Sequence, residues 1–174
     1  MTDKKDITTG DDGERLTLRK SSKLRHRSLV KGIFESGKNV YCWPLRAMCR
    51  PLSESELTET FRDHVPDRIG RVQIMITVPK KKRRHAVDRV LMRRRIREAF
   101  RLRRRDFEKA VRTHEEIRTL GIAIIYVADR NITFSDIDRK MEQLLRKISS
   151  SLTPGPQSAA SGPKTEASQN GTEP

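Results

Sequence analysis

The feature that most constrains the fold is a block of positive charge between residues 80 and 105. This segment contains three Lys and eleven Arg but only two acidic residues, Asp88 and Glu98, so its net charge is +12 in a chain whose total is +15. Like charges at this density repel one another and oppose compaction. The segment is therefore predicted to lie at the surface and to face a polyanion. The predominance of Arg favours a nucleic-acid backbone as that polyanion.

The same segment has the periodicity of an amphipathic helix from Ala86 to about Phe107, preceded by a basic loop at residues 80–84. At about 100° per residue, basic side chains gather on one arc: Arg93, Arg94, Arg97, Arg101 and Arg104. Apolar side chains occupy the opposite side: Leu91, Met92, Ile96, Ala99, Phe100 and Leu102. Arg95 and Arg103 fall on the apolar side, and we expect their long stems to carry the charges outward to solvent.

The residues before this segment contain at least one helix and one strand. Residues 27–36 have apolar side chains at helical spacing, and Gly37 follows where a helix C-terminal glycine is common. Residues 40–50 alternate in the manner of a strand with one buried face, with a possible extra strand pair around residues 41–43. Residues 52–69 lack clean periodicity, and we predict a surface loop there.

Two strands and one helix are predicted in the remainder. Residues 71–78 alternate strictly between apolar and other side chains, which indicates a strand. Residues 122–127 are continuously apolar, the pattern of a strand covered on both faces. After a turn at residues 131–134, Ser135 is a plausible N-cap. It precedes a helix with one apolar stripe: Ile137, Met141, Leu144, Leu145 and Ile148.

The length of 174 residues allows one domain, which we place at residues 15–152. The polar segments 1–14 and 153–174 cannot bury enough surface to offset the entropy of ordering, so both are expected to be disordered tails. Cys42 and Cys49 have no partners at zinc spacing and are interpreted as ordinary thiols. No apolar run approaches the roughly 20 residues needed to cross a bilayer, and no signal segment is visible. We therefore expect a cytoplasmic protein without a membrane partner.

The order of motifs carries a resemblance to a known family. A strand is followed by K-K, then A-V-x-R, then R-R-x-x-R-E on a helix, all between Val78 and Arg101. A weaker match lies upstream: Lys23, Leu24, Val30, Ile33, Phe34 and Gly37 fall at that family's spacing for its first helix. Over about residues 23–152, the chain resembles the bacterial ribonuclease P protein component.

The resemblance implies an α+β fold, a two-layer α/β sandwich like domain 2 of ribosomal protein S5. Its order would be α-β-β-β-α-β-α, with the basic helix in a left-handed β-α-β crossover. It also implies a protein subunit of ribonuclease P without catalytic residues of its own. A catalytic RNA subunit would cleave the 5′ leader from precursor tRNA, with Mg²⁺ bound mainly by that RNA and no small-molecule cofactor. The expected partners are therefore the catalytic RNA and precursor tRNA.

The resemblance also implies two binding surfaces. Residues expected to hold phosphates of the catalytic RNA lie in the loop and helix: Lys80, Lys81, Arg89, Arg93, Arg94, Arg97 and Arg101. Residues expected to line the cleft for the precursor leader come from the first helix and the second strand: Val30, Phe34, Arg46 and Met48. Only one of these is aromatic, so we predict a leader grip that depends on charge, from Arg46 and Arg50, more than on stacking.

The chain departs from the family pattern at the start of the basic helix. The family has R-N-R where this chain has Arg89, Val90 and Leu91, so two polar positions are apolar here. Contacts that the family's Asn and second Arg make are therefore not expected in the same form. Arg95 and the flanking basic residues 82–84 are a hypothetical source of compensating charge.

Two other classes of function are alternatives to this one. A structural RNA-binding protein of ribosomal type could use the same ridge without any linked cleavage. An independent nuclease could use His85 and His114 as an acid/base pair, but nothing in the sequence brings the two together. Asp88 is expected to favour the helix N-terminus, and Glu98 to pair with Arg94 or Arg101. Tyr41 and Trp43 are predicted to pack rather than to stack on RNA.

Overall fold

The structure is a computed structural model that describes residues 18–62, 65–66 and 69–152. The tails predicted at residues 1–14 and 153–174 lie outside the described residues. The elements, in chain order, are η1 Lys20–Ser22, α1 Arg27–Ser36, β1 Lys38–Cys42, β2 Leu45–Leu52, α2 Glu54–Thr60, β3 Val72–Thr77, α3 Ala86–Arg112, β4 Thr119–Tyr126 and α4 Phe134–Leu152.

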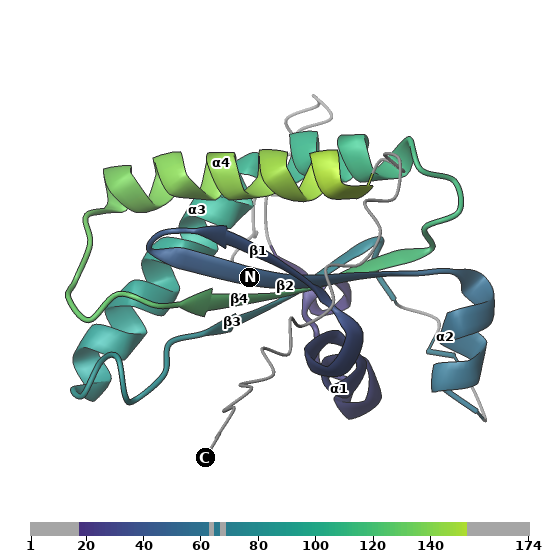
Figure 1. Ribbon diagram of the computed structural model, residues 1–174, viewed down its shortest axis with the longest axis horizontal. Coiled ribbons are helices and arrows are strands. Elements are labelled where there is room, and N and C mark those ends of the chain that lie inside the picture. Colours follow the sequence, from purple (N-terminus) through teal and green to yellow (C-terminus); the bar gives the residue numbers. More distant parts are fainter. Residues whose placement is uncertain (1–17, 63–64, 67–68, 153–174) are drawn as a thin grey trace, which may run out of the picture.

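A four-stranded sheet in the order β1-β2-β4-β3 forms the middle of the molecule. The pairs β1–β2 and β2–β4 are antiparallel, while β3 and β4 run parallel and are connected through α3. Helices α3 and α4 lie together on one face of the sheet, and α1 lies on the other (Figure 1). The predicted α+β class is confirmed. The predicted order α-β-β-β-α-β-α is also confirmed when η1 and α2, which were not predicted, are left out.

The larger hydrophobic core lies between the sheet and the pair α3–α4. The predicted stripe of α4 is confirmed: Ile137, Met141, Leu144, Leu145 and Ile148 are all buried in it. Strand β4 is covered on both faces as predicted, because Ile122 and Ile124 enter this core while Ala123 enters a smaller one beneath α1. At about 25 cal/mol per Å² of apolar surface, these two cores are the main source of stability.

Two glycines avoid close contacts with residue Ile33 of α1. A Cβ on Gly121 of β4 would lie 2.5 Å from Cδ1 of Ile33, so any larger residue there would force the Ile33 side chain to move. Gly37 ends α1 with φ −75°, which any residue could adopt. Glycine is needed at this position for a different reason: a Cβ there would collide with the carbonyl oxygen of Ile33. Helix α1 itself has the predicted bounds.

Three details of the predicted elements are wrong. The single strand predicted over residues 40–50 is instead two, since a turn at residues 43–44 folds them into the β1–β2 hairpin, in agreement with the possible extra strand pair predicted around residues 41–43. The predicted loop at 52–69 contains α2, which begins with a capping box between Ser53 and Glu56. Helix α4 begins at Phe134, two residues earlier than expected from an N-cap at Ser135, because the hydroxyl of Thr133 accepts the N–H of Asp136 at 3.3 Å.

Helix α3 is also longer than predicted and extends to Arg112. Within the described ranges, no helix combines the length and the apolar character that a membrane span requires.

Candidate nucleic-acid interface

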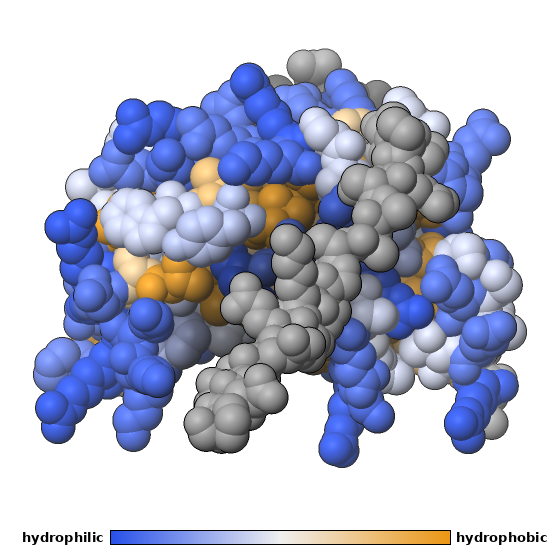
Figure 2. All heavy atoms as spheres, in the orientation of Figure 1, coloured by the Kyte–Doolittle hydropathy of each residue, from blue (hydrophilic) through white to orange (hydrophobic). Residues whose placement is uncertain are grey.

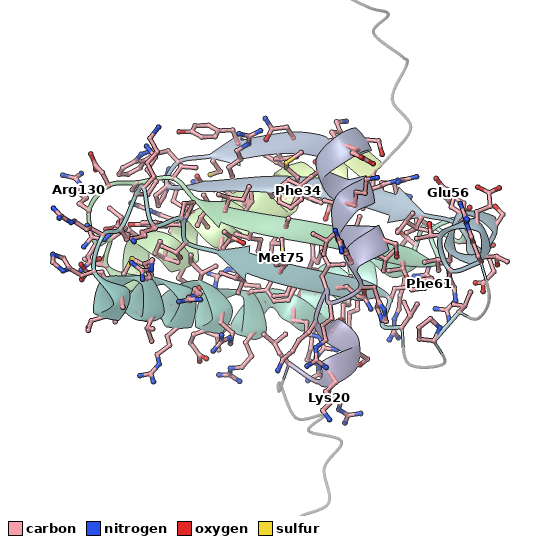
Figure 3. The ribbon with its side chains drawn as sticks, turned by 90° about the horizontal axis from the view of Figure 1, so that it is seen from below. Lys20, Phe34, Glu56, Phe61, Met75 and Arg130 are labelled. Carbon is pink, nitrogen blue, oxygen red and sulfur yellow. The ribbon has the colours of Figure 1, made fainter. Side chains whose placement is uncertain are left out.

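The basic arc of α3 is accessible, but its members differ in how far they are committed to internal contacts. Arg94 and Arg97 are exposed, and neither forms an ion pair or a hydrogen bond within the described residues. Lys80 and Lys81, in the loop before α3, are exposed in the same way. Figure 3 shows long nitrogen-tipped side chains projecting from the outer side of α3. These four predicted binding residues are available to a ligand.

The C-terminal part of the arc is partly neutralised by acidic neighbours on the same helix. Arg101 binds Glu98 through two hydrogen bonds, of 2.6 and 2.9 Å. The hydrogen bond and charge of Arg101 lower the pKa of Glu98, so this carboxylate stays ionised at neutral pH. Arg104 pairs with Glu108 at 2.7 Å. The sequence-based expectation that Glu98 pairs with Arg94 or Arg101 is confirmed for Arg101.

The N-terminal part of the arc contributes to the fold of the basic loop. Arg89 donates to the backbone carbonyls of Arg83 and Arg84, at 3.0 and 2.5 Å, and Nε of Arg93 donates to the carbonyl of Arg89 at 3.3 Å. The predicted RNA-binding residue Arg89 therefore shapes the loop that presents Lys80 and Lys81, whereas Arg93 contacts only the preceding turn of α3.

An ion pair fixes this loop to the start of α3. Arg83 pairs with Asp88 at 2.5 Å and also donates to the carbonyl of Asp129 at 2.5 Å. The hydrogen bond from Asn131, together with the charge of Arg83, lowers the pKa of Asp88. The basic loop, the first turn of α3 and the β4–α4 loop thus form one bonded unit.

Two arginines that were expected to extend to solvent instead join elements of the core layer. Arg95 donates to the backbone carbonyl of Ile132. Arg103 pairs with Asp138 and, at 3.4 Å, with Glu142, both on α4. The prediction failed because these carboxylates come within reach only when α4 packs against α3. Leu102, predicted on the buried side, is 43% exposed.

The second surface is the face of the sheet that carries α1. Helix α1 crosses the strands and leaves their ends toward the β1–β2 turn without a covering helix (Figure 3). Strand register places Arg46 of β2 opposite Ile125 of β4, and Met48 opposite Ala123. Ala123 in turn lies opposite Met75 of β3. We call this part of the sheet, with the adjoining side of α1, the open sheet face.

All four predicted cleft residues lie on the open sheet face. Phe34 is 44% exposed and lies on the same side of α1 as Met75 in Figure 3. Val30 and Met48 are partly buried against the smaller core. Nε of Arg46 donates to Oδ1 of Asn39 at 2.9 Å, and Arg46 has no carboxylate partner among the described residues.

Arg50, by contrast, pairs with Glu56 of α2 at 3.2 Å. Its charge is therefore less available than that of Arg46, which leaves Arg46 as the main cation of this face. Met75 was missed because the sequence does not show which strands are neighbours.

The predicted packing of Tyr41 and Trp43 is wrong. Tyr41 is 54% exposed and Trp43 44% exposed. Tyr41 lies opposite Arg46 in the β1–β2 pair, so its side chain is on the open sheet face while its neighbours Val40 and Cys42 enter the core. The sequence signal for this placement is the hairpin turn, which fixes the register of β1.

The structure does not assemble an acid/base pair from the histidines. His85 and His114 lie at opposite ends of α3, about 40 Å apart for a helix of this length. His114 is 3.5 Å from Glu116. In the described part of the chain, no group of three or more His, Cys, Asp or Glu side chains is arranged to hold a metal ion.

Comparisons with known proteins agree with one another. A family model described as Ribonuclease P matches residues 18–149. The ribonuclease P protein component of Porphyromonas gingivalis is 29% identical over 135 residues, covering 78% of this chain and 88% of that protein. A solved structure of the RNase P protein from Staphylococcus aureus is similar in fold, with a TM-score of 0.51 and 20% identity over 76% of this chain and 93% of its own.

A second structure, of a Staphylococcus aureus RNase P protein mutant with defective mRNA degradation activity, has a TM-score of 0.50 and 18% identity, and the match covers 74% of this chain and 89% of that one.

Proposed function

This chain belongs to the ribonuclease P protein family, whose members are subunits of a ribonucleoprotein endoribonuclease, and from that premise we propose how it binds its RNA partners. Helix α3 and the basic loop bind the catalytic RNA. The open sheet face binds the 5′ leader of precursor tRNA. By holding both, the protein assists removal of the leader during maturation of the tRNA 5′ end.

The observation that carries the proposal is the state of Arg94 and Arg97. Both are exposed without an internal partner in the described ranges, although Arg83, Arg101 and other neighbours are paired. A guanidinium group presents a planar set of donors that matches two phosphate oxygens at once. These two residues are one turn apart on the same side of α3, so they suit successive phosphates along a folded RNA.

The open sheet face suits a single strand better than a duplex. Phe34, an exposed aromatic side chain of this face, offers a surface for an unstacked base, and Arg46 of β2 offers a charge for the backbone. A strand laid across it would lie beside both α1 and the sheet. The leader of precursor tRNA is the unpaired segment that fits this description.

Mg²⁺ enters this proposal through the RNA. We assign the ion mainly to the catalytic RNA subunit, which carries out the cleavage in this proposal. The contribution of this chain is electrostatic: cations on α3 reduce repulsion between RNA segments and thereby lower the Mg²⁺ concentration that the assembly requires.

The test is a cleavage assay with purified components at limiting Mg²⁺. Precursor tRNA is incubated with the protein, with the large RNA subunit, and with both. Release of the leader only with both components, or much faster with both, is the expected result. Cleavage by the protein alone would identify an independent nuclease instead, and binding without stimulation would indicate a structural RNA-binding protein.

A further inference from the structure

We propose that the corner formed by Tyr41, Trp43 and Arg130 is a separate stacking site for an unpaired RNA nucleotide. We call these three residues the aromatic corner. The proposal rests on the proposed function in one respect, that the ligand is RNA. It adds a site beyond the predicted cleft, whose residues lie on α1 and β2.

The aromatic corner lies at the end of the sheet where three connections meet. Cys42 pairs with Leu45 at the tip of the β1–β2 hairpin, so Trp43 occupies the turn itself. The N–H of Val127 donates to the carbonyl of Pro44 at 3.0 Å, which holds the β4–α4 loop against that turn. Arg83 connects the basic loop to the same place through Asp129.

Trp43 is held on one side and open on the other. The guanidinium carbon of Arg130 lies 5.9 Å from the centroid of the Trp43 ring, within the range of a cation–π contact. The ring is nevertheless 44% exposed. An indole fixed in this way is a rigid platform, so stacking a base on it costs little additional side-chain entropy.

The surroundings of the corner are cationic. Arg130 forms no ion pair with any described carboxylate, and Lys147 of α4 donates to the carbonyl of Tyr41 at 3.1 Å. Figure 2 shows pale side chains of intermediate hydropathy over the β1–β2 hairpin, with hydrophilic ones above and to the left and hydrophobic ones below and to the right. Exposed rings between unpaired cations are the pattern by which proteins hold single-stranded nucleic acid, with stacking for the bases and charge for the phosphates.

The corner is continuous with the open sheet face. Tyr41 lies opposite Arg46 in the β1–β2 register, and Arg46 is two residues from Met48 of the predicted cleft. A strand that runs along β2 from Met48 toward the hairpin turn would therefore meet Arg46 and Tyr41, and then Trp43. The corner also adjoins the basic loop before α3, so the nucleotide can come from either the leader or the catalytic RNA.

The chain offers a direct probe, because Trp43 is its only tryptophan. A base stacked on the indole quenches its fluorescence. We would titrate the full chain with precursor tRNA carrying a long leader, with mature tRNA, and with the large RNA subunit. Quenching by the long-leader precursor but not by mature tRNA assigns the corner to the leader, and quenching by the large RNA assigns it to the catalytic RNA.

Substitutions then test whether the ring contributes to binding. Trp43→Phe keeps a stacking face and is expected to bind the quenching RNA nearly as well as the unchanged protein, measured with labelled RNA. Trp43→Ala is expected to weaken binding roughly five- to a hundredfold. Tyr41→Ala is expected to weaken it too. Arg146→Gln, at an exposed position of α4, is the control and is expected to leave binding unchanged.

Circular dichroism checks the fold of each variant, and Tyr41→Ala serves if Trp43→Ala unfolds, because Tyr41 is the more exposed ring. Absence of quenching by all RNAs, or binding by both Ala variants at the strength of the unchanged protein, overturns the proposal. If the cleavage assay still shows stimulation, the aromatic corner alone has failed. If stimulation is absent while quenching occurs, the proposed function has failed and the corner stands as an RNA site.

Discussion

Replacing Arg94 and Arg97 together by Gln is the sharpest test of the α3 interface. Neither residue has an internal partner in the described ranges, so their loss removes phosphate contacts without breaking the fold. Each neutralised phosphate contributes about 0.9 to the slope of log K against log salt concentration. The slope for binding the large RNA should therefore be shallower by about 2. When the salt concentration is raised from about 50 to 200 mM, the factor by which affinity falls should be roughly ten times smaller for the variant than for the unchanged protein.

The assay is equilibrium binding of labelled large RNA at several salt concentrations. The matched control is Arg139→Gln with Arg146→Gln, which removes the same charge from α4, where both side chains are exposed and paired with acids of their own helix. Its slope should stay unchanged. If the two double variants flatten the slope equally, binding depends only on net charge and the assignment to α3 is refuted.

Three further predictions concern the open sheet face and the stability of the fold. Phe34→Ala should weaken binding of a long-leader precursor only about fivefold, because charge carries most of the grip; a leader-length series measures this, and a collapse of affinity from this change alone would contradict it. Arg103→Met should lower the free energy of unfolding by about 1 kcal/mol in urea, because it breaks the bridge between α3 and α4, whereas Arg146→Met should cost less than about 0.5 kcal/mol. The hydrogen bond from the Ser53 N–H and the contact with Arg50 lower the pKa of Glu56, so the stability it confers is complete above the ordinary value of about 4.3 and is lost as the pH falls through the lowered one. Glu56→Gln should therefore lose less stability than the unchanged protein between about pH 5 and pH 3, measured by urea midpoints.

Sequence periodicity was sufficient to predict the elements whose two faces differ strongly in polarity. The α4 stripe and the Arg94–Arg97 side of α3 follow from helical spacing alone, because each helix contains the information about its own faces. Helix α2 was missed for the opposite reason: with seven residues it is too short for periodicity. Its capping box, from Ser53 to Glu56, was nevertheless visible in the sequence.

Contacts between elements were not predictable in this way. The partners of Arg103 lie on α4, 35 and 39 residues further along the chain, and the sequence does not give the packing of α3 on α4 that brings them together. Tyr41 was misassigned because its face depends on where the hairpin turns: a single strand over 40–50 and a turn at 43–44 give β1 different registers. The candidate site was therefore predictable where it is helical and incomplete where it depends on sheet register.

The charge of residues 80–105 overstates the number of phosphates that α3 can bind. Arg83, Arg89, Arg95 and Arg103 bind backbone carbonyls or carboxylates within the fold, and Arg101 is paired on its own helix. Val90 is 41% exposed within the arc and contributes no charge. Apart from Arg105, which is exposed further along α3, the cations left for RNA are concentrated at the loop and at Arg94 and Arg97. If RNA binds at defined positions, the salt slope should correspond to these few residues. If RNA binds through the total charge of the segment, the slope should correspond to the larger number of all its basic residues.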